Sequence, residues 1–188
     1  GIADLEVSGS LTINESVTAE VVDFVTNDDG VGHDINVNAN ITSTNGNLRL
    51  RSGDDLNQAT GTILDADALL DLRVDSAGGS DVGGNTANLN GSLIAGTQIF
   101  VYGGNEDDQV IIDGNGGALN DGGTVDGVQS LFSFLGGTGI DELIVDDSGD
   151  VTGDTIDIVS TLPGSGTVGG ATAVALGFQD LENLTVFT

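Results

Sequence analysis

The feature that most constrains this chain is a repeated pattern of short aliphatic stretches separated by clusters of Gly, Asn and Asp. In the clearest stretch, Ile35–Ile41, aliphatic residues at every second position alternate with three asparagines. A period of two is typical of a strand that is buried on one side. No segment shows the 3.6-residue period of an amphipathic helix. We therefore predict an all-β fold of short strands.

Further stretches of the same character recur along the chain. The distance from the start of one stretch to the start of the next is irregular and is often near one or two dozen residues. This irregularity disfavours propellers and leucine-rich repeats. The 31 glycines and single proline suit tight corners, and the absence of a strict Gly-X-Y period excludes collagen. The predicted strands are Leu11–Ile13, Leu48–Leu50, Leu70–Val74, Ile99–Val101, Val110–Ile112, Leu143–Val145, Ile156–Ile158 and Leu184–Val186.

Two all-β architectures fit such strands. In a parallel β-helix, or β-solenoid, each coil lays a strand above its predecessor, aliphatic side chains fill the interior, and outward Asn or Asp residues form ladders. In an antiparallel β-sandwich, hairpins join the same strands. We favour the parallel β-helix. One pairing has a distinctive charge pattern: a shift of 22 residues stacks Arg49 on Asp71, which is favourable, and Arg51 on Arg73, which is not.

Charge restricts the partners. Thirty acidic residues, three arginines and no lysine give a net charge of −27, so nucleic acid and anionic membrane surfaces would be repelled. We expect bound Ca²⁺, high external salt or both to offset the self-repulsion, and therefore an extracellular location. No apolar run approaches the length of a membrane span, so we expect no membrane insertion. We interpret residues 1–188 as one domain, a fragment or processed product of a longer chain.

Three segments of the first half, Gly9–Ile13, His33–Ile41 and Thr44–Leu50, resemble repeats of filamentous-haemagglutinin-type adhesins. This resemblance covers residues 1–75. It implies a right-handed parallel β-helix by analogy of fold, and it identifies no receptor.

Residues 76–188 resemble the Gly- and Asp-rich repetitive parts of giant bacterial surface proteins, as seen at Asp146–Asp150 and Leu181–Val186. Within them, Gly136–Ile144 matches the calcium-binding RTX nonapeptide G-G-x-G-x-D-x-U-x at every specified position, and Gly103–Ile111 matches except at Glu106.

In the RTX family, glycine carbonyls and the aspartate bind Ca²⁺, and each nonapeptide supplies half a site. The resemblance thus implies Asp141 and Asp108 as ligands, with Asp107 beside them, provided that the fold stacks the two copies. A second acidic stretch, Asp146, Asp147 and Asp150, also offers oxygen ligands for Ca²⁺. The alternative at both places is a glycine-rich turn with solvated carboxylates.

The leading functional hypothesis is a structural or adhesive module of an extracellular bacterial surface protein, a stalk or surface layer. Its partners would be neighbouring repeats, further copies of itself, or a cell-surface or matrix ligand. The first alternative is a subunit of a filament in which a strand such as Leu5–Ile13 completes a neighbour's sheet. The second is a β-helix enzyme acting on polysaccharide, with Asp107 and Asp108 as acid and base. Because basic and aromatic residues are scarce, we expect no enzyme.

Overall fold

The computed structural model describes residues 1–27, 32–75, 83–151, 155–171 and 174–188. These residues form an all-β structure of three sheets. Sheet A has nine strands, in the spatial order β1 (Ile2–Val7), β4 (Val21–Thr26), β7 (Leu48–Arg51), β10 (Leu69–Arg73), β13 (Gln98–Gly104), β15 (Phe132–Gly137), β19 (Leu176–Gln179), β18 (Ser165–Gly169) and β17 (Asp157–Leu162).

Sheets B and C are shorter. Sheet B has seven strands, in the order β2 (Leu11–Ile13), β5 (Ile35–Val37), β8 (Leu56–Gln58), β11 (Thr86–Leu89), β14 (Gln109–Asp113), β16 (Glu142–Asp146) and β20 (Asn183–Phe187). Sheet C has four strands, β3 (Val17–Ala19), β6 (Ile41–Ser43), β9 (Ile63–Ala66) and β12 (Ser92–Ala95).

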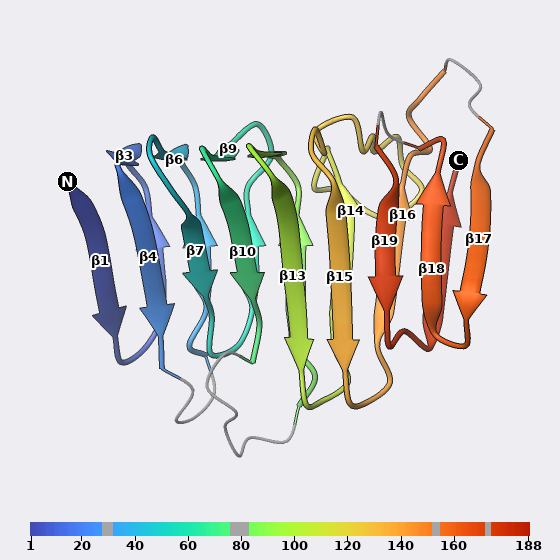
Figure 1. Ribbon diagram of the computed structural model, residues 1–188, viewed down its shortest axis with the longest axis horizontal. Coiled ribbons are helices and arrows are strands. Elements are labelled where there is room, and N and C mark those ends of the chain that lie inside the picture. Colours follow the sequence, from blue (N-terminus) through green and yellow to red (C-terminus); the bar gives the residue numbers. More distant parts are fainter. Residues whose placement is uncertain (28–31, 76–82, 152–154, 172–173) are drawn as a thin grey trace.

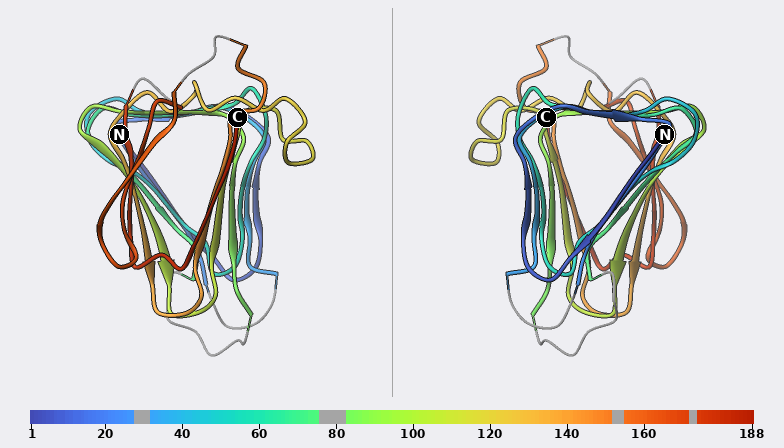
Figure 2. Two further views of the ribbon diagram at one scale, coloured as in Figure 1. Left: turned by 90° about the vertical axis from the view of Figure 1, so that its right-hand side faces the viewer. Right: turned by 90° about the vertical axis from the view of Figure 1, so that its left-hand side faces the viewer.

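The first four coils, from β1 to β12, each add one strand to sheets A, B and C in turn, and the later coils add strands to sheets A and B only (Figure 1). All strand pairs are parallel except those of β18 with β19 and with β17. Seen from the N-terminal end, the chain runs clockwise around a triangular cross-section as it recedes (Figure 2), which makes the coil right-handed. The prediction of a right-handed parallel β-helix is confirmed, and the antiparallel sandwich is excluded.

The core consists of aliphatic rows that run along the stack. Val22, Leu48, Leu70, Ile99 and Phe132 pair successively in sheet A and are fully buried. Because strands in a sheet are about 4.8 Å apart, each inward side chain packs on its counterpart in the next coil. Alternating aliphatic residues therefore fill most of the interior, and among the described residues the few buried aromatic side chains are Phe24, Phe132 and Phe134.

The predicted strands occur in the structure, with one correction and several omissions. The stretch Ile35–Ile41 is not a single strand: β5 ends at Val37 and β6 begins at Ile41. A corner between sheets B and C lies at 38–40, and the inward alternation continues across it. The alternating pattern is unchanged by the corner, so the pattern alone could not reveal it. The other strands of sheet C, and strands such as β4 and β15, were not predicted.

The 22-residue shift, on which the two charge pairs gave opposite indications, is the register found between β7 and β10. Arg49 pairs with Asp71, and Arg51 pairs with Arg73, between β7 and β10. The unfavourable stacking of the two arginines is offset by separate partners. Arg51 Nη2 lies 2.7 Å from Oδ1 of Asp23 on β4, and Arg73 Nε lies 2.9 Å from Oδ1 of Asp71 on its own strand.

The expected asparagine ladder lies on the outer face of sheet B. Asn57 Nδ2 donates to Asn36 Oδ1 at 3.2 Å, and Asn88 Nδ2 donates to Asn57 Oδ1 at 2.8 Å. Stacked amides satisfy one another's donors and acceptors from coil to coil. The ladder therefore fixes the register of β5, β8 and β11 from outside, while the aliphatic rows fix it from inside.

Candidate cation-binding corner

The two nonapeptides lie on top of each other at the corner where sheet A passes into sheet B, which we call the A–B corner. Gly104 of β13 pairs with Gly137 of β15, and Gln109 of β14 pairs with Glu142 of β16. The intervening turns are therefore stacked, one coil apart. The fold thus meets the condition under which the two copies could act together.

Acidic side chains of the A–B corner accept hydrogen bonds from backbone amides of the preceding coil. Asp54 Oδ2 accepts from the N–H of His33 at 2.7 Å, and Asp108 Oδ1 accepts from the N–H of Asn85 at 3.1 Å. One coil further on, Asp141 Oδ1 accepts from the N–H of Asp108 at 3.0 Å.

Glu182 repeats the bond once more, accepting from the N–H of Asp141 at 2.8 Å. Each of these acidic residues stands two positions before the first inward aliphatic residue of a sheet B strand, as at Asp54 before Leu56. Asp54 and Glu182 were not among the predicted site residues. The recurring acid-x-aliphatic pattern is the signal in the sequence that could have found them.

The glycines of the motif provide the space that the aspartates fill. A Cβ on Gly136 would lie 2.4 Å from Asp141 Oδ2 and 2.2 Å from the carbonyl oxygen of Asp180. A Cβ on Gly103 would lie 2.7 Å from Asp108 Oδ2 and 2.5 Å from the carbonyl oxygen of Gly136. In both copies the volume that a side chain on the glycine would take is therefore occupied by two oxygens. One belongs to the aspartate of the same nonapeptide, and the other is a backbone carbonyl of the next coil.

Two carboxylate oxygens at this corner are buried without a hydrogen-bond partner, namely Oδ2 of Asp108 and Oδ2 of Asp141. Both residues are only 1% exposed. Burial, and secondarily the charges of Asp141, Asp75 and Glu106, raise the pKa of Asp108 to about 7. Burial also raises the pKa of Asp141. A buried charge of this kind favours a proton or a cation close to it.

Asp107 differs from its neighbour. It is exposed, and its Oδ1 accepts from the N–H of Ile140 at 2.8 Å. Asp107 and Asp108 are thus not a pair that could face a sugar together, because Asp108 is buried in the turn.

The other predicted residues lie at a different corner, where the chain leaves sheet B. Asp146 is fully buried, and its Oδ1 accepts from Ser148 Oγ at 2.6 Å. Asp147 is 3% exposed and accepts from the N–H of Val125 at 3.3 Å, whereas Asp150 is half-buried. These side chains brace the loop and are not gathered with the A–B corner.

Asp113, which was not predicted, pairs with Asp146 in sheet B and is 2% exposed. Burial first, and then the charge of Asp146, raise the pKa of Asp113. The second corner thus repeats the arrangement of buried stacked carboxylates, but here backbone and serine groups donate hydrogen bonds to Asp113 and Asp146.

Within the described ranges, no three or more His, Asp or Glu side chains are arranged as a ready-made metal site. No helix of the described part of the chain is long and apolar enough to cross a membrane. Comparison with protein-family models, curated proteins and solved structures finds no match for this chain. Its function must therefore be argued from its own geometry.

Proposed function

We propose that this chain is a structural and adhesive module of an extracellular bacterial surface protein, part of a stalk or a surface layer. The observation that supports this most strongly is the continuity of the stack. Side-chain rows and backbone hydrogen bonds run without interruption through all seven strands of sheet B and through the parallel strands of sheet A. Such a structure transmits force along its axis through many parallel contacts, which suits a spacer.

The charge of −27 supports an exterior location, because carboxylates on every face keep a rod soluble and attract cations. Labelling of unpermeabilised source cells with an antiserum raised against this chain tests the proposal. We expect labelling of intact cells at the level seen after permeabilisation. Labelling that requires permeabilisation would contradict it.

We propose further that Ca²⁺ binds at the A–B corner. The oxygens that support this are Oδ2 of Asp108 and Asp141, which are buried and without hydrogen-bond partners. The carbonyl oxygens of Gly136 and Asp180 lie in the same glycine-lined spaces. Hard anionic and carbonyl oxygens are the ligands that Ca²⁺ prefers, and water would complete its coordination.

A filament subunit is the second candidate, and the free edges of sheet A support it. β1 and β17 are the outermost strands of that sheet. Because β17 is antiparallel to β18 and β18 is antiparallel to β19, β17 runs in the direction of β1 (Figure 1). A second copy translated along the axis could therefore place its β1 beside β17 in the parallel arrangement of the rest of the sheet.

A further inference from the structure

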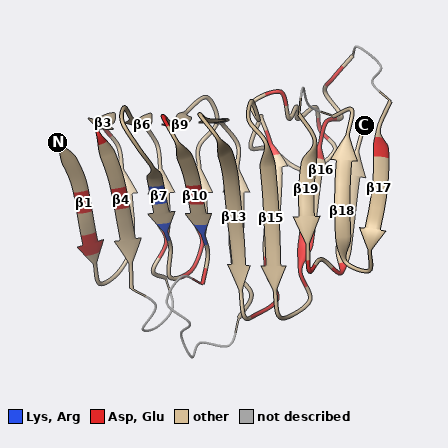
Figure 3. Cartoon of the chain, in the orientation of Figure 1, with Lys and Arg blue, Asp and Glu red and all other residues tan. Residues whose placement is uncertain are grey.

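All three arginines of the chain lie together on the outer face of sheet A. Arg49 and Arg51 are on β7 and Arg73 is on β10, where Figure 3 colours these positions blue on neighbouring strands. In a chain with thirty acidic residues this is a marked segregation of positive charge. We call these three residues the arginine cluster.

The arginine cluster has three guanidinium groups and two acidic partners, Asp23 and Asp71, and the next carboxylate of this row, Asp4 on β1, pairs with Asp23. Arg73 binds both oxygens of Asp71, with Nε and Nη2 at 2.9 and 3.0 Å, and Arg51 Nη2 binds Asp23 at 2.7 Å. The third guanidinium, that of Arg49, lies between the same two carboxylates.

Arg49 is 3.7 Å from Asp23 and 3.8 Å from Asp71, beyond hydrogen-bond distance. Its side chain is 41% exposed. The planar donors of Arg49 are therefore available to another carboxylate, with which guanidinium groups form short, two-pronged hydrogen bonds.

An aromatic surface adjoins the arginine cluster. In the register of sheet A, Asp71 is followed by Phe100 and Arg73 by Tyr102, both on β13. The two rings are stacked with centroids 5.8 Å apart, and the Arg73 guanidinium lies 4.7 Å from the Tyr102 ring centroid. The cluster and the rings are thus one continuous surface.

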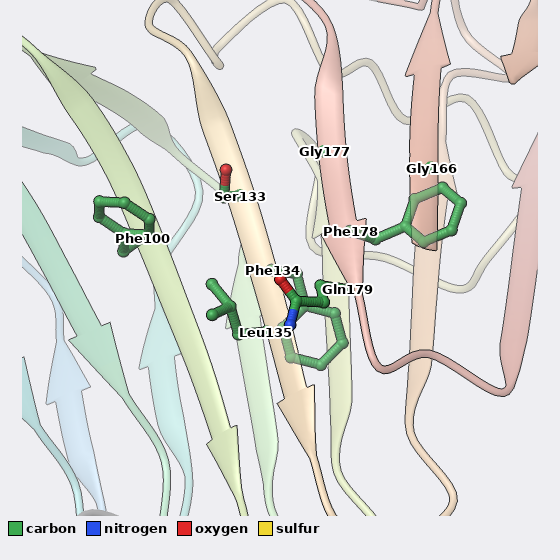
Figure 4. A pocket seen from close by; sticks show the side chains of 8 residues that line it. All are labelled: Phe100, Ser133, Phe134, Leu135, Gly166, Gly177, Phe178 and Gln179. Atoms are coloured by element: carbon green, nitrogen blue, oxygen red, sulfur yellow. The ribbon is translucent and has the colours of Figure 1, made fainter. Parts of the chain in front are cut away.

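A shallow groove of about 220 Å³ extends this surface towards the C-terminal end. Phe100 stands at one side of the groove beside the small residues Ser133 and Gly177 (Figure 4), whereas Phe178 pairs with the buried Phe134 and packs against the core. Gln179 adds a polar group at the rim. From β7 to β19 the whole strip crosses five strands, which at about 4.8 Å per step gives about 19 Å.

We propose that this strip binds an acidic polysaccharide, a chain of uronic acid residues that crosses the strands of sheet A. A carboxylate of the sugar would bind Arg49, and the apolar faces of neighbouring rings would lie on Phe100 and in the groove over Ser133 and Gly177. The proposal deepens the adhesive part of the proposed function by naming the class of ligand.

A sugar chain fits this surface better than an acidic peptide does. Peptides commonly bind a sheet by adding a strand at a free edge, whereas β7 to β19 are each paired on both sides. A ligand on this strip can therefore contact side chains but cannot add a strand. The arginine cluster, the aromatic rings and the groove follow one another across the sheet, which suits a sugar chain in which carboxylates alternate with apolar ring faces.

The remaining negative charge of the protein does not prevent such binding. At about 0.15 M salt the screening length is about 8 Å, so distant carboxylates act weakly on a ligand in contact with Arg49. Binding should nevertheless weaken as salt increases, because the contact itself is ionic.

Calorimetric titration of the protein with a galacturonic acid oligosaccharide in EDTA tests the proposal. EDTA excludes bridging by a divalent cation. We expect binding of the acidic oligosaccharide and none of the neutral galactose oligosaccharide of equal length. Arg49→Gln should raise Kd at least about tenfold, and Phe100→Thr should also weaken binding. Unchanged melting of both variants shows that the fold is intact.

Asn14→Asp is the matched control, since it adds one negative unit of charge, as Arg49→Gln does, on another face and keeps the acceptor for Asn38 Nδ2. This control should leave Kd unchanged. The proposal is overturned by absent binding, by equal binding of the neutral sugar, by an Arg49→Gln variant that binds normally, or by tighter binding of polyglutamate. These measurements are independent of cell labelling, so failure of the glycan site and failure of the surface location can be told apart.

Discussion

At the scale of single residues, the buried aspartates of the A–B corner link stability to pH. The ordinary pKa of an aspartate is 3.8, and burial raises that of Asp108 to about 7. Between these values the folded chain keeps a proton that the unfolded chain releases. Stability is therefore greatest at the acidic end of this window and is lost as the pH rises through it.

We predict that the free energy of unfolding falls by up to the order of 4 kcal/mol between pH 4 and pH 7 through Asp108 alone. Burial raises the pKa of Asp55, Asp113 and Asp141 in the same direction. Urea unfolding in EDTA across this pH range measures the effect. Asp108→Asn should flatten the dependence and stabilise the protein at neutral pH, whereas Asp67→Asn, at an exposed position, should not. An identical slope in Asp108→Asn would refute the assignment.

The glycine and aspartate positions of the nonapeptides could be predicted from the sequence, but the use of each carboxylate could not. Asp141 Oδ1 accepts from the N–H of Asp108, a residue 33 positions earlier. Nothing within nine consecutive residues specifies that donor. It depends on coil length, which varies from 19 residues, between Ile2 and Val21, to 44, between Phe132 and Leu176.

At the scale of the strands, the edges of sheet A differ from its interior. The side chains of β17 are all exposed, including Ile158 at 53% and Leu162 at 68%. Ile158 pairs with Val168, which is fully buried and pairs with Leu176. The row of core side chains that contains Leu176 and Val168 thus ends at Ile158, which is exposed to solvent at the edge of sheet A. An exposed apolar edge strand of this kind favours edge-to-edge association.

If a second copy adds its β1 to this edge, Ile158→Lys should reduce association, because a lysine there blocks strand addition. Sedimentation velocity at increasing protein concentration, with electron microscopy of the same samples, measures this. We expect extended particles from the unmodified chain and fewer from Ile158→Lys. Val151→Lys, which makes the same change of charge at a residue 96% exposed outside the strands, is the control. A chain that stays monomeric at all concentrations rules out the filament.

A strand could be predicted where turn residues bound a stretch of alternating apolar residues. Leu11–Ile13 is an example, and the structure has β2 at the same residues. A strand could not be predicted where alternation continues through a corner, as between β5 and β6. Both strands bury every second residue, so the bend leaves no mark in the hydrophobic pattern.

At the scale of the whole molecule, a charge of −27 on one rod makes stability depend on ions. Sodium chloride should raise the melting temperature by screening. Calcium should raise it further at equal ionic strength, because an ion that binds only the folded state adds about 2.7 kcal/mol at a concentration of about one hundred times Kd.

Calorimetric melting at pH 7.5 in EDTA, in sodium chloride and in calcium chloride of matched ionic strength separates the two effects. The variant Asp108→Asn with Asp141→Asn should lose the calcium increment and keep the sodium effect. Asp67→Asn should keep both. Equal melting in calcium and in matched sodium chloride would leave screening as the whole effect and end the calcium proposal.

The sequence by itself determined an all-β fold of short strands, because a period of two, frequent glycine corners and small aliphatic side chains are local properties, and the resemblance to adhesin repeats favoured the β-helix over the sandwich. The sequence left the pairing of Arg49 with Asp71 undecided, because the same shift stacks Arg51 on Arg73. Only the tertiary structure decided which distant residues share a face. It brought the three arginines beside Phe100 and Tyr102, and it stacked Asp108 on Asp141, because coil lengths set by irregular loops determine the alignment of one turn on the next.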